Sequence, residues 1–114
     1  MRNTDKDRIE VGSDVIATIV AGAIKRVPGV YGMHGSIVND VMDMLGKHQY
    51  SKGVSVEPLD NGSVNIDVHI VVEFLSSIPS IAKSVQKEIK EYVEKLSSVK
   101  VNEVRVFIDD VVRL

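Results

Sequence analysis

The stretch Val64-Asn65-Ile66-Asp67-Val68-His69-Ile70-Val71-Val72-Glu73-Phe74 decides the fold of this chain. Its even-numbered residues are all apolar, and its odd-numbered residues are polar except for Val71. Alternation with a period of two is typical of a β-strand that buries one face and exposes the other. The sequence therefore predicts a strand over 64–74 with one face in the core.

A second strand is predicted over Val54–Pro58, and the register between the two strands follows from parity. Facing residues share a side of the sheet, so the apolar Val56 must lie opposite the apolar Ile66. This pairing requires a three-residue loop, Asp60-Asn61-Gly62. We expect Gly62 to take a positive φ that closes such a loop with a bulge.

Two further segments carry apolar residues at helical spacing. The first predicts a helix over 14–27 with Ser13 as its N-cap and Pro28 just beyond its end. The second predicts a helix over 78–97 that has Pro79 in its first turn. The two apolar stripes are Val15, Ile16, Ile19, Val20, Ala23, Ile24 and Val27, and Ile78, Ile81, Ala82, Val85, Ile89, Val93 and Leu96.

The remaining elements are a brief extended stretch over 9–11, a short helix over 37–45 and a last strand over 99–112. The predicted order is β-α-β-β-α-β, the short helix aside. Two one-sided helices and a small sheet with one apolar face bury those surfaces together as two layers. We predict an α+β two-layer sandwich with both main helices on one face of a small mixed sheet, whose strand order stays open.

Length and composition bound the class of protein. With 114 residues the chain has room for one domain, predicted over 9–114 after a flexible N-terminal arm over 1–8. The formal net charge of −2 gives no long-range attraction to nucleic acid. Because the chain has no cysteine, disulfides, thiolate nucleophiles and iron–sulfur clusters are excluded.

The first residues are charged, and no apolar run approaches the roughly 18 residues of a membrane span. We therefore expect a cytoplasmic protein that does not insert into the membrane itself.

Several segments together resemble a known family. They are Gly29-Val30-Tyr31-Gly32-Met33, Gly53-Val54-Ser55-Val56, the strand over 64–74, Ile78-Pro79-Ser80-Ile81-Ala82-Lys83-Ser84-Val85-Gln86 and the strand over 101–108. In order and spacing, across residues 9–112, the chain is similar to the alkaline-shock proteins of Gram-positive bacteria, also called envelope stress response proteins. The resemblance implies a small, non-enzymatic cytoplasmic protein, linked to cell-envelope homeostasis and held near the membrane by a separate membrane-spanning partner.

The candidates for catalysis or metal binding are weak. His34, His48 and His69 are the only histidines, and none belongs to a recognised motif. Asp67 shares the outward face of its strand with His69, but a zinc site or a catalytic triad needs at least three convergent groups. We therefore expect no catalytic residues, no cofactor and no metal.

One alternative is a nucleic-acid-binding loop. Gly29 and Gly32 have the Gly-x-x-Gly spacing with which KH domains clamp a nucleic-acid backbone, and Lys25 and Arg26 precede them. A KH loop would lead into another helix, whereas the residues after Gly32 do not continue as one. We favour a turn that needs glycine's conformational freedom, and we keep the KH-like module as the alternative function.

Small residues form a strip on the first helix: Ala17, Thr18, Ala21 and Gly22. Small side chains allow close approach of another segment. The strip either lies under the glycine-rich segment 29–53 or receives another chain.

A second candidate surface lies on the outward face of the sheet. Val71 and Phe107 both fall on the parity opposite to the core residues of their strands, and Arg105 shares that face. If the two strands are neighbours, these residues form a small patch with a polar rim that suits a protein partner.

The function predicted from the sequence is that of a non-enzymatic protein-interaction module linked to the envelope stress response. We expect a homo-oligomer that acts as a scaffold or adaptor near the cytoplasmic membrane through a membrane-anchored partner. Many weak contacts would then add through effective concentration.

Overall fold

The central element of the fold is strand β3, Val64–Glu73, in the computed structural model, which describes residues 9–33 and 53–113. Buried and partly exposed residues alternate along its whole length. Ile66, Val68, Ile70 and Val72 are completely buried. The strand predicted from alternation is therefore confirmed, and it ends one residue before Phe74.

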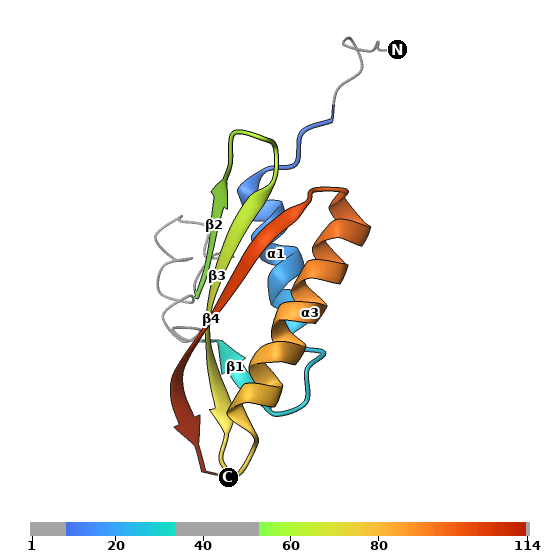
Figure 1. The fold of residues 1–114 in the computed structure, drawn as a ribbon. Coiled ribbons are helices and arrows are strands. Elements are labelled where there is room, and N and C mark those ends of the chain that lie inside the picture. The colour runs from blue at the N-terminus through green and yellow to red at the C-terminus, as the bar shows by residue number, and fades with distance from the viewer. Residues whose placement is uncertain (1–8, 34–52, 114) are drawn as a thin grey trace, which may run out of the picture.

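Both edges of β3 are paired, and Figure 1 shows the resulting sheet. Strand β4, Val101–Val112, runs parallel to β3 along one edge from end to end. The other edge is divided between β2, Val54–Pro58, which pairs antiparallel with residues 64–68, and β1, Val30–Met33, which pairs antiparallel with residues 70–72. The sheet is mixed, as predicted, and β3 pairs with each of β1, β2 and β4.

The loop between β2 and β3 has the predicted length and register. Val56 lies opposite Ile66. The amide of Leu59 donates to the carbonyl of Ser63 at 2.8 Å, which leaves a three-residue loop between them. Gly62 closes that loop with a φ of 89°, as expected for the residue that must be glycine.

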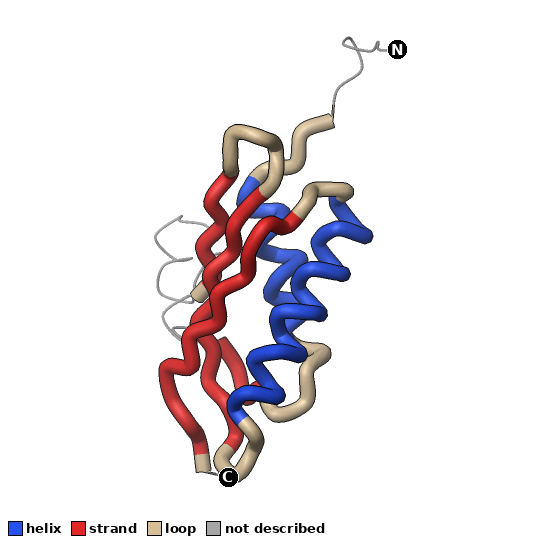
Figure 2. Tube along the Cα trace, viewed as in Figure 1, coloured by secondary structure: helices blue, strands red, loops and turns tan. Residues whose placement is uncertain are grey.

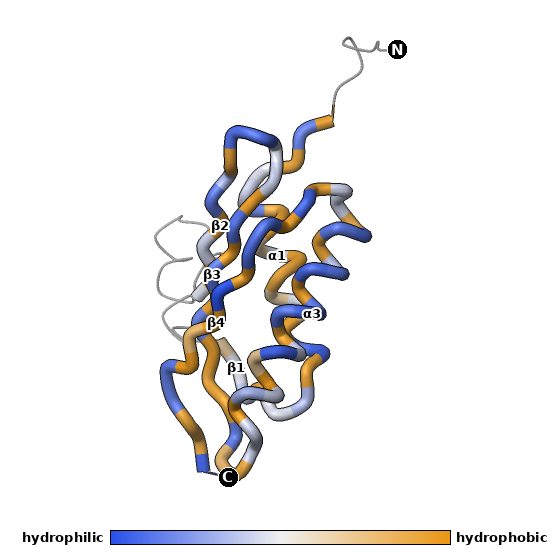
Figure 3. Tube along the Cα trace, viewed as in Figure 1, coloured by the Kyte–Doolittle hydropathy of each residue, from blue (hydrophilic) through white to orange (hydrophobic). Residues whose placement is uncertain are grey.

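Two helices cover one face of the sheet, α1 (Ser13–Ile24) and α3 (Ile78–Ser97), as Figures 1 and 2 show. Figure 3 shows apolar and polar positions alternating along the strands, and apolar positions recurring among polar ones along α3. The core takes Ile16, Ala17, Val20, Ala23 and Ile24 from α1, Ile81, Val85, Ile89 and Val93 from α3, and Val54, Val64, Ile66, Val68, Ile70, Val72 and Val101 from the sheet. The predicted two-layer α+β sandwich is confirmed.

The boundaries of α1 differ from the prediction at both ends. Its N-cap is Gly12, and Ser13 is the first helical residue, with no side-chain cap hydrogen bond. The helix ends at Ile24, because the amide of Val27 bonds the carbonyl of Ile24 at 3.1 Å in a tighter turn. Pro28 disfavours helical geometry in the residue before it, so the chain leaves the helix early.

The bounds of α3 match the predicted 78–97. Ser77 caps the helix by accepting a hydrogen bond from the amide of Ser80 at 3.4 Å. Pro79 lies in the first turn, where its missing N–H costs nothing. Ser98, with a φ of 64°, ends the helix in the left-handed conformation.

The predicted order of elements is wrong in one place. Residues 9–11 form no strand, and Ile9 is 92% exposed. The edge of β3 that they could have used is occupied by β1 and β2, so the observed order is α-β-β-β-α-β. The last strand begins at Val101 rather than Val99, and the predicted arm over 1–8 and helix over 37–45 lie outside the described residues.

Some residues of the predicted apolar stripes are exposed instead of buried. Val15 lies in the first turn of α1, Ile78 begins α3 and Leu96 lies in its last turn. Phe74 follows the end of β3 and is also exposed. At the ends of an element the opposing layer no longer covers the stripe.

The tight turn at Gly29 yields a stability prediction. Gly29 has a φ of 94°, and a Cβ placed there would lie 2.7 Å from Cδ1 of Ile81. We expect Gly29→Ala to lower the free energy of unfolding by about 1–3 kcal/mol, because the residue would be strained and Ile81 displaced. Urea denaturation followed by circular dichroism measures the change.

The matched control is Gly32→Ala, because a Cβ at Gly32 would meet nothing within 4 Å. The control should leave stability nearly unchanged. Equal stability of the two variants would contradict the assignment of Gly29 as the constrained turn residue.

Candidate protein-interaction surface

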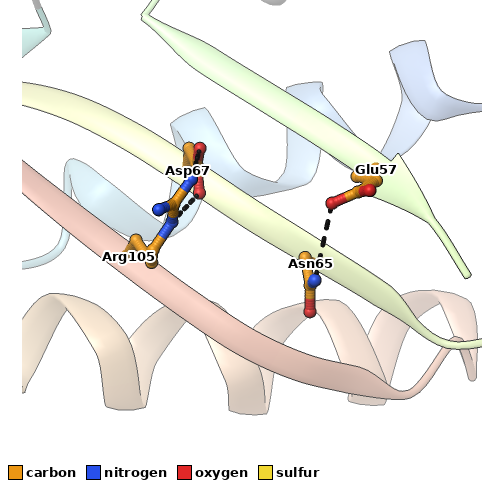
Figure 4. Close-up of polar contacts among 4 residues, drawn as sticks. All are labelled: Glu57, Asn65, Asp67 and Arg105. Carbon is orange, nitrogen blue, oxygen red and sulfur yellow. Dashed lines mark hydrogen bonds and ion pairs between the residues drawn. The ribbon is translucent and has the colours of Figure 1, made fainter.

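The outer face of the sheet, opposite the helices, carries a charged pair that joins β3 to β4. Asp67 and Arg105 are register partners. The guanidinium donates two hydrogen bonds to the carboxylate, from Nε to Oδ1 at 2.9 Å and from Nη2 to Oδ2 at 2.7 Å. Figure 4 shows these side chains pointing toward one another, with Asn65 facing Glu57 across β3 and β2. The Asn65 amide donates to Glu57 at 3.5 Å.

The ion pair fixes the charge state of both partners. Hydrogen bonding from Arg105 lowers the pKa of Asp67, against a smaller opposing effect of burial. In return, the bond to Asp67 raises the pKa of Arg105. This part of the face therefore keeps a fixed plus–minus pair over a wide pH range.

An aromatic stack and a second polar contact lie beside this pair. The rings of His69 and Phe107, which are register partners, stack with centroids 4.6 Å apart at an interplanar angle of 10°. His69 Nδ1 lies 3.0 Å from Oδ2 of Asp109. The Arg105 guanidinium lies 5.5 Å from the centre of the Phe107 ring, within range of a cation–π contact.

We call these five residues, Asp67, His69, Arg105, Phe107 and Asp109, the outer-face cluster. Phe107 is 37% exposed within it, so an aromatic ring held by its neighbours remains available at the surface. Aromatic side chains and arginine are enriched at protein interfaces. No described helix covers this face.

The predicted patch is only partly assembled. β3 and β4 are neighbours, so Val71 and Phe107 do share one face of the sheet, as anticipated. However, the register shifts between Ile70 and Val71, and Val71 lies opposite Asp110 on β4 and Gly32 on β1. Val71 is partly buried, and the polar residues of the cluster dominate this face.

The strip of small residues on α1 is divided by the packing. Ala17 is completely buried and Thr18 is exposed, with its hydroxyl donating to the carbonyl of Asp14 at 2.9 Å. A Cβ on Gly22 would lie 3.8 Å from the Tyr92 ring, so Gly22 borders α3. Ala21 is partly exposed. The four residues are therefore not one free surface, and residues 34–52 of the glycine-rich segment that was expected over them lie outside the described part.

The KH-like loop does not have the geometry that its spacing suggested. Gly29 forms a turn, but Gly32 lies inside β1, whose backbone pairs with β3. Lys25 is exposed, whereas Arg26 contacts Glu88 at 3.3 Å and lies 5.3 Å from the centre of the Tyr92 ring on α3. The second glycine of the Gly-x-x-Gly spacing therefore lies in a paired strand and not in a loop.

Metal binding finds no geometric support in the described residues. Within 9–33 and 53–113, no group of three or more histidine, cysteine, aspartate or glutamate side chains could hold an ion. His34 and His48 lie outside those ranges. His69, the remaining histidine, belongs to the outer-face cluster.

Sequence reasoning missed two features. The first is the set of residues on β4 that contact Asp67 and His69. The sequence showed that Asp67 and His69 share one face of their strand, but their partners follow only from the order of the strands. The second feature is a group of exposed apolar residues at one end of the sheet, Phe74, Leu75, Ile78 and Val111. There Arg113 lies 4.2 Å from the centre of the Phe74 ring.

The architecture and this surface together define a small two-layer α+β domain that presents a charged, partly aromatic sheet face. Comparison with known families gives the identity more closely. Residues 1–113 match the alkaline shock protein 23 family, described as having a cell envelope-related function. The chain belongs to this family, which confirms the resemblance seen in the sequence.

Relatives in Gram-positive bacteria cover nearly the whole chain. The uncharacterized protein YqhY of Bacillus subtilis is 36% identical over 106 residues, which are 93% of this chain and 78% of that protein. The uncharacterized protein Spy1614 of Streptococcus pyogenes is 32% identical over 96% of this chain and 91% of its own length. A stress response regulator gls24 homolog of Streptococcus pyogenes is 29% identical over 97% of this chain and 66% of its own length. None of these descriptions names an enzymatic activity.

Solved structures support the fold. The MamM-CTD H264A structure has a TM-score of 0.53 and 13% identity, covering 87% of this chain and 98% of that one. The MamM CTD C267S structure has a TM-score of 0.52 at the same identity, covering 85% and 94%. At this identity the likeness concerns the fold alone. Within the described part of this chain, neither helix has the length and apolar character needed to cross a membrane.

The Asp67–Arg105 pair gives a pH-dependent prediction. Because the pKa of Asp67 is lowered in the folded chain, the pair stabilises the fold above the ordinary pKa of aspartate, and this stabilisation is lost as the pH falls through the lowered value. We expect Asp67→Asn to be less stable than the wild type at neutral pH and equally stable in strong acid. The difference should be small because the Arg105 side chain is 59% exposed, so solvent screens the pair.

Urea unfolding of both proteins across the acid range measures this difference. Glu91→Gln on the exposed face of α3 is the control and should track the wild type at every pH. A gap between wild type and Asp67→Asn that stays constant from neutral to acid pH would show that the pair does not titrate as described.

Proposed function

We propose that this chain is a non-enzymatic protein-interaction module of the envelope stress response. It acts as a self-associating adaptor that a membrane-anchored partner holds near the cytoplasmic membrane. The family's cell envelope-related description and the relatives named as stress response regulators support the cellular context. The structural observation that carries the binding role is the outer-face cluster.

The outer-face cluster has the features of a binding surface. Phe107 stacks on His69 and lies within cation–π range of Arg105, so little conformational freedom is lost when a partner covers it. Arg105 still has donors available on Nη1, since its bonds to Asp67 use Nε and Nη2. A preorganised aromatic ring and an arginine with free donors together provide both burial and directional bonds.

A scaffold of this kind needs no turnover. Each copy would contribute one modest contact, and several copies gathered on one membrane-anchored partner would reinforce each other through effective concentration. The protein would then act on the envelope by holding partners together.

Affinity capture tests the proposal. We expect the wild-type chain, cross-linked in cells at native expression, to recover one membrane-spanning protein in stoichiometric amount from the membrane fraction. Phe107→Glu should lose most of this protein, because a carboxylate replaces the apolar ring at the centre of the surface. Mass spectrometry of the membrane and soluble fractions measures the recovery.

The control is Lys90→Glu on the exposed face of α3, which should recover the same protein as the wild type. Circular dichroism and urea unfolding establish that both variants fold. Equal recovery by Phe107→Glu and wild type would exclude the outer face as the binding surface. Recovery of RNA-bound proteins from the soluble fraction alone would exclude the adaptor role.

A further inference from the structure

Strand β4 has one edge that pairs with nothing in the described part of the chain. β3 lies along its other edge from Val101 to Val112. An open edge presents backbone N–H and C=O groups that a strand of another chain can pair with. What limits such pairing is how much of the edge is accessible and which side chains would face each other.

Two features confine the accessible part of this edge to residues 105–109. On one side, the Gln86 side chain reaches from α3 and donates to the carbonyl of Val104 at 3.1 Å. On the other side, the ladder with β3 skips Asp109, because Ile70 pairs with Ile108 and Val71 with Asp110. A bulge of this kind interrupts regular pairing. The stretch 105–109, which has the bulged Asp109 as its last residue, is centred on Phe107.

The direction of the backbone groups suits an antiparallel pairing about this centre. The Val104 carbonyl points to Gln86 and away from β3, and bonding groups along a strand point alternately to its two edges. The groups of Val106 and Ile108 therefore face the open edge as well. When two copies pair antiparallel about Phe107, Val106 of each lies opposite Ile108 of the other, and the two exchange N–H···O bonds in both directions.

The side chains of the outer face match in the same register. Phe107 lies opposite its own counterpart, in the closer type of antiparallel pair where side chains pack well. Arg105 lies opposite the partner's Asp109, and symmetry repeats this contact on the other side of the axis. Opposite charges directly across an antiparallel pair are stabilising.

Neighbouring registers lack this complementarity. Centring the pair on Val106 would place Glu103 opposite the partner's Asp109, which is a like-charge contact. Centring it on Ile108 would place Phe107 opposite the partner's Asp109 and Arg105 opposite an apolar residue. Placing the axis between two residues would set outer-face side chains against core-face ones.

We propose that two copies of this chain associate through residues 105–109 of β4, paired antiparallel about a two-fold axis at Phe107. This inference rests on the proposed function and names the surface through which self-association occurs. The contact is isologous and joins the two sheets edge to edge. The guanidinium of Arg105 then bridges Asp67 of its own chain and the partner's Asp109.

A charge exchange tests the register directly. Arg105→Asp places an aspartate opposite the partner's Asp109 at both symmetric positions, and Asp109→Arg places an arginine opposite the partner's Arg105. We expect each variant alone to dimerise at least roughly tenfold more weakly than the wild type. In an equimolar mixture the two variants present opposite charges to each other, so they should form a heterodimer with affinity near that of the wild type.

Sedimentation velocity of the full purified chains, with native mass spectrometry to identify the heterodimer, measures both effects. Lys90→Asp and Glu91→Arg are the matched controls, since they make the same changes in charge on the exposed face of α3. Each control should dimerise like the wild type, and a mixture of the two should form no excess of heterodimer. Circular dichroism checks that all four variants fold.

The outcomes separate this inference from the proposed function. Wild-type association that survives in both single variants would place the contact on another surface, which overturns the inference and leaves the adaptor role intact. A mixture that stays monomeric would overturn the register. A wild-type chain that is monomeric at every concentration would overturn the inference, and the capture of a membrane-spanning partner would then decide whether the adaptor role stands.

Discussion

The structure depends on the alternation of β3, because this one strand gives one face to the core and the other to the outer surface, and pairs with a neighbouring strand along each edge. Its even-numbered residues form the apolar face against which α1 and α3 pack. The complete burial of Ile66, Val68, Ile70 and Val72 removes a large apolar area from water. Its odd-numbered residues supply Asp67 and His69 to the outer face. A shift of one residue in its pairing would exchange the two sets and destroy the core and the outer-face cluster together.

The register of β3 also explains why much of the fold was accessible to sequence reasoning. Alternation predicted the strand, parity predicted the β2–β3 loop, and helical spacing with Ser77 and Pro79 predicted the bounds of α3. These features are local, since each depends on residues close together in the chain. The predicted strand over 9–11 was wrong because its apolar residues were judged alone. In the structure, β1 and β2 occupy the edge of β3 that such a strand would need.

The outer-face cluster was less predictable because it depends on pairing between distant segments. Parity placed Asp67, His69, Arg105 and Phe107 on outward faces, but the strand order and the β3–β4 register determine which of them meet. The small residues of α1 show the opposite case. Their spacing suggested one continuous strip, whereas packing buries Ala17 in the core and sets Gly22 beside Tyr92, because small residues suit a helix–helix contact as well as a surface.

The parallel pairing of β3 with β4 has a consequence for the order of folding. Val64 pairs with Val101 and Glu73 with Val112, so the paired residues are 37 (101 minus 64) to 39 (112 minus 73) positions apart in the sequence. The β2–β3 hairpin closes a loop of only a few residues, whereas the pairing of β4 with β3 closes a much longer one, so we expect β4 to dock later. Arg105 and Phe107 would therefore meet Asp67 and His69 late in folding. A partly folded chain in which β4 is not yet paired lacks the outer-face cluster, so a partner that recognises the cluster would bind only the folded chain.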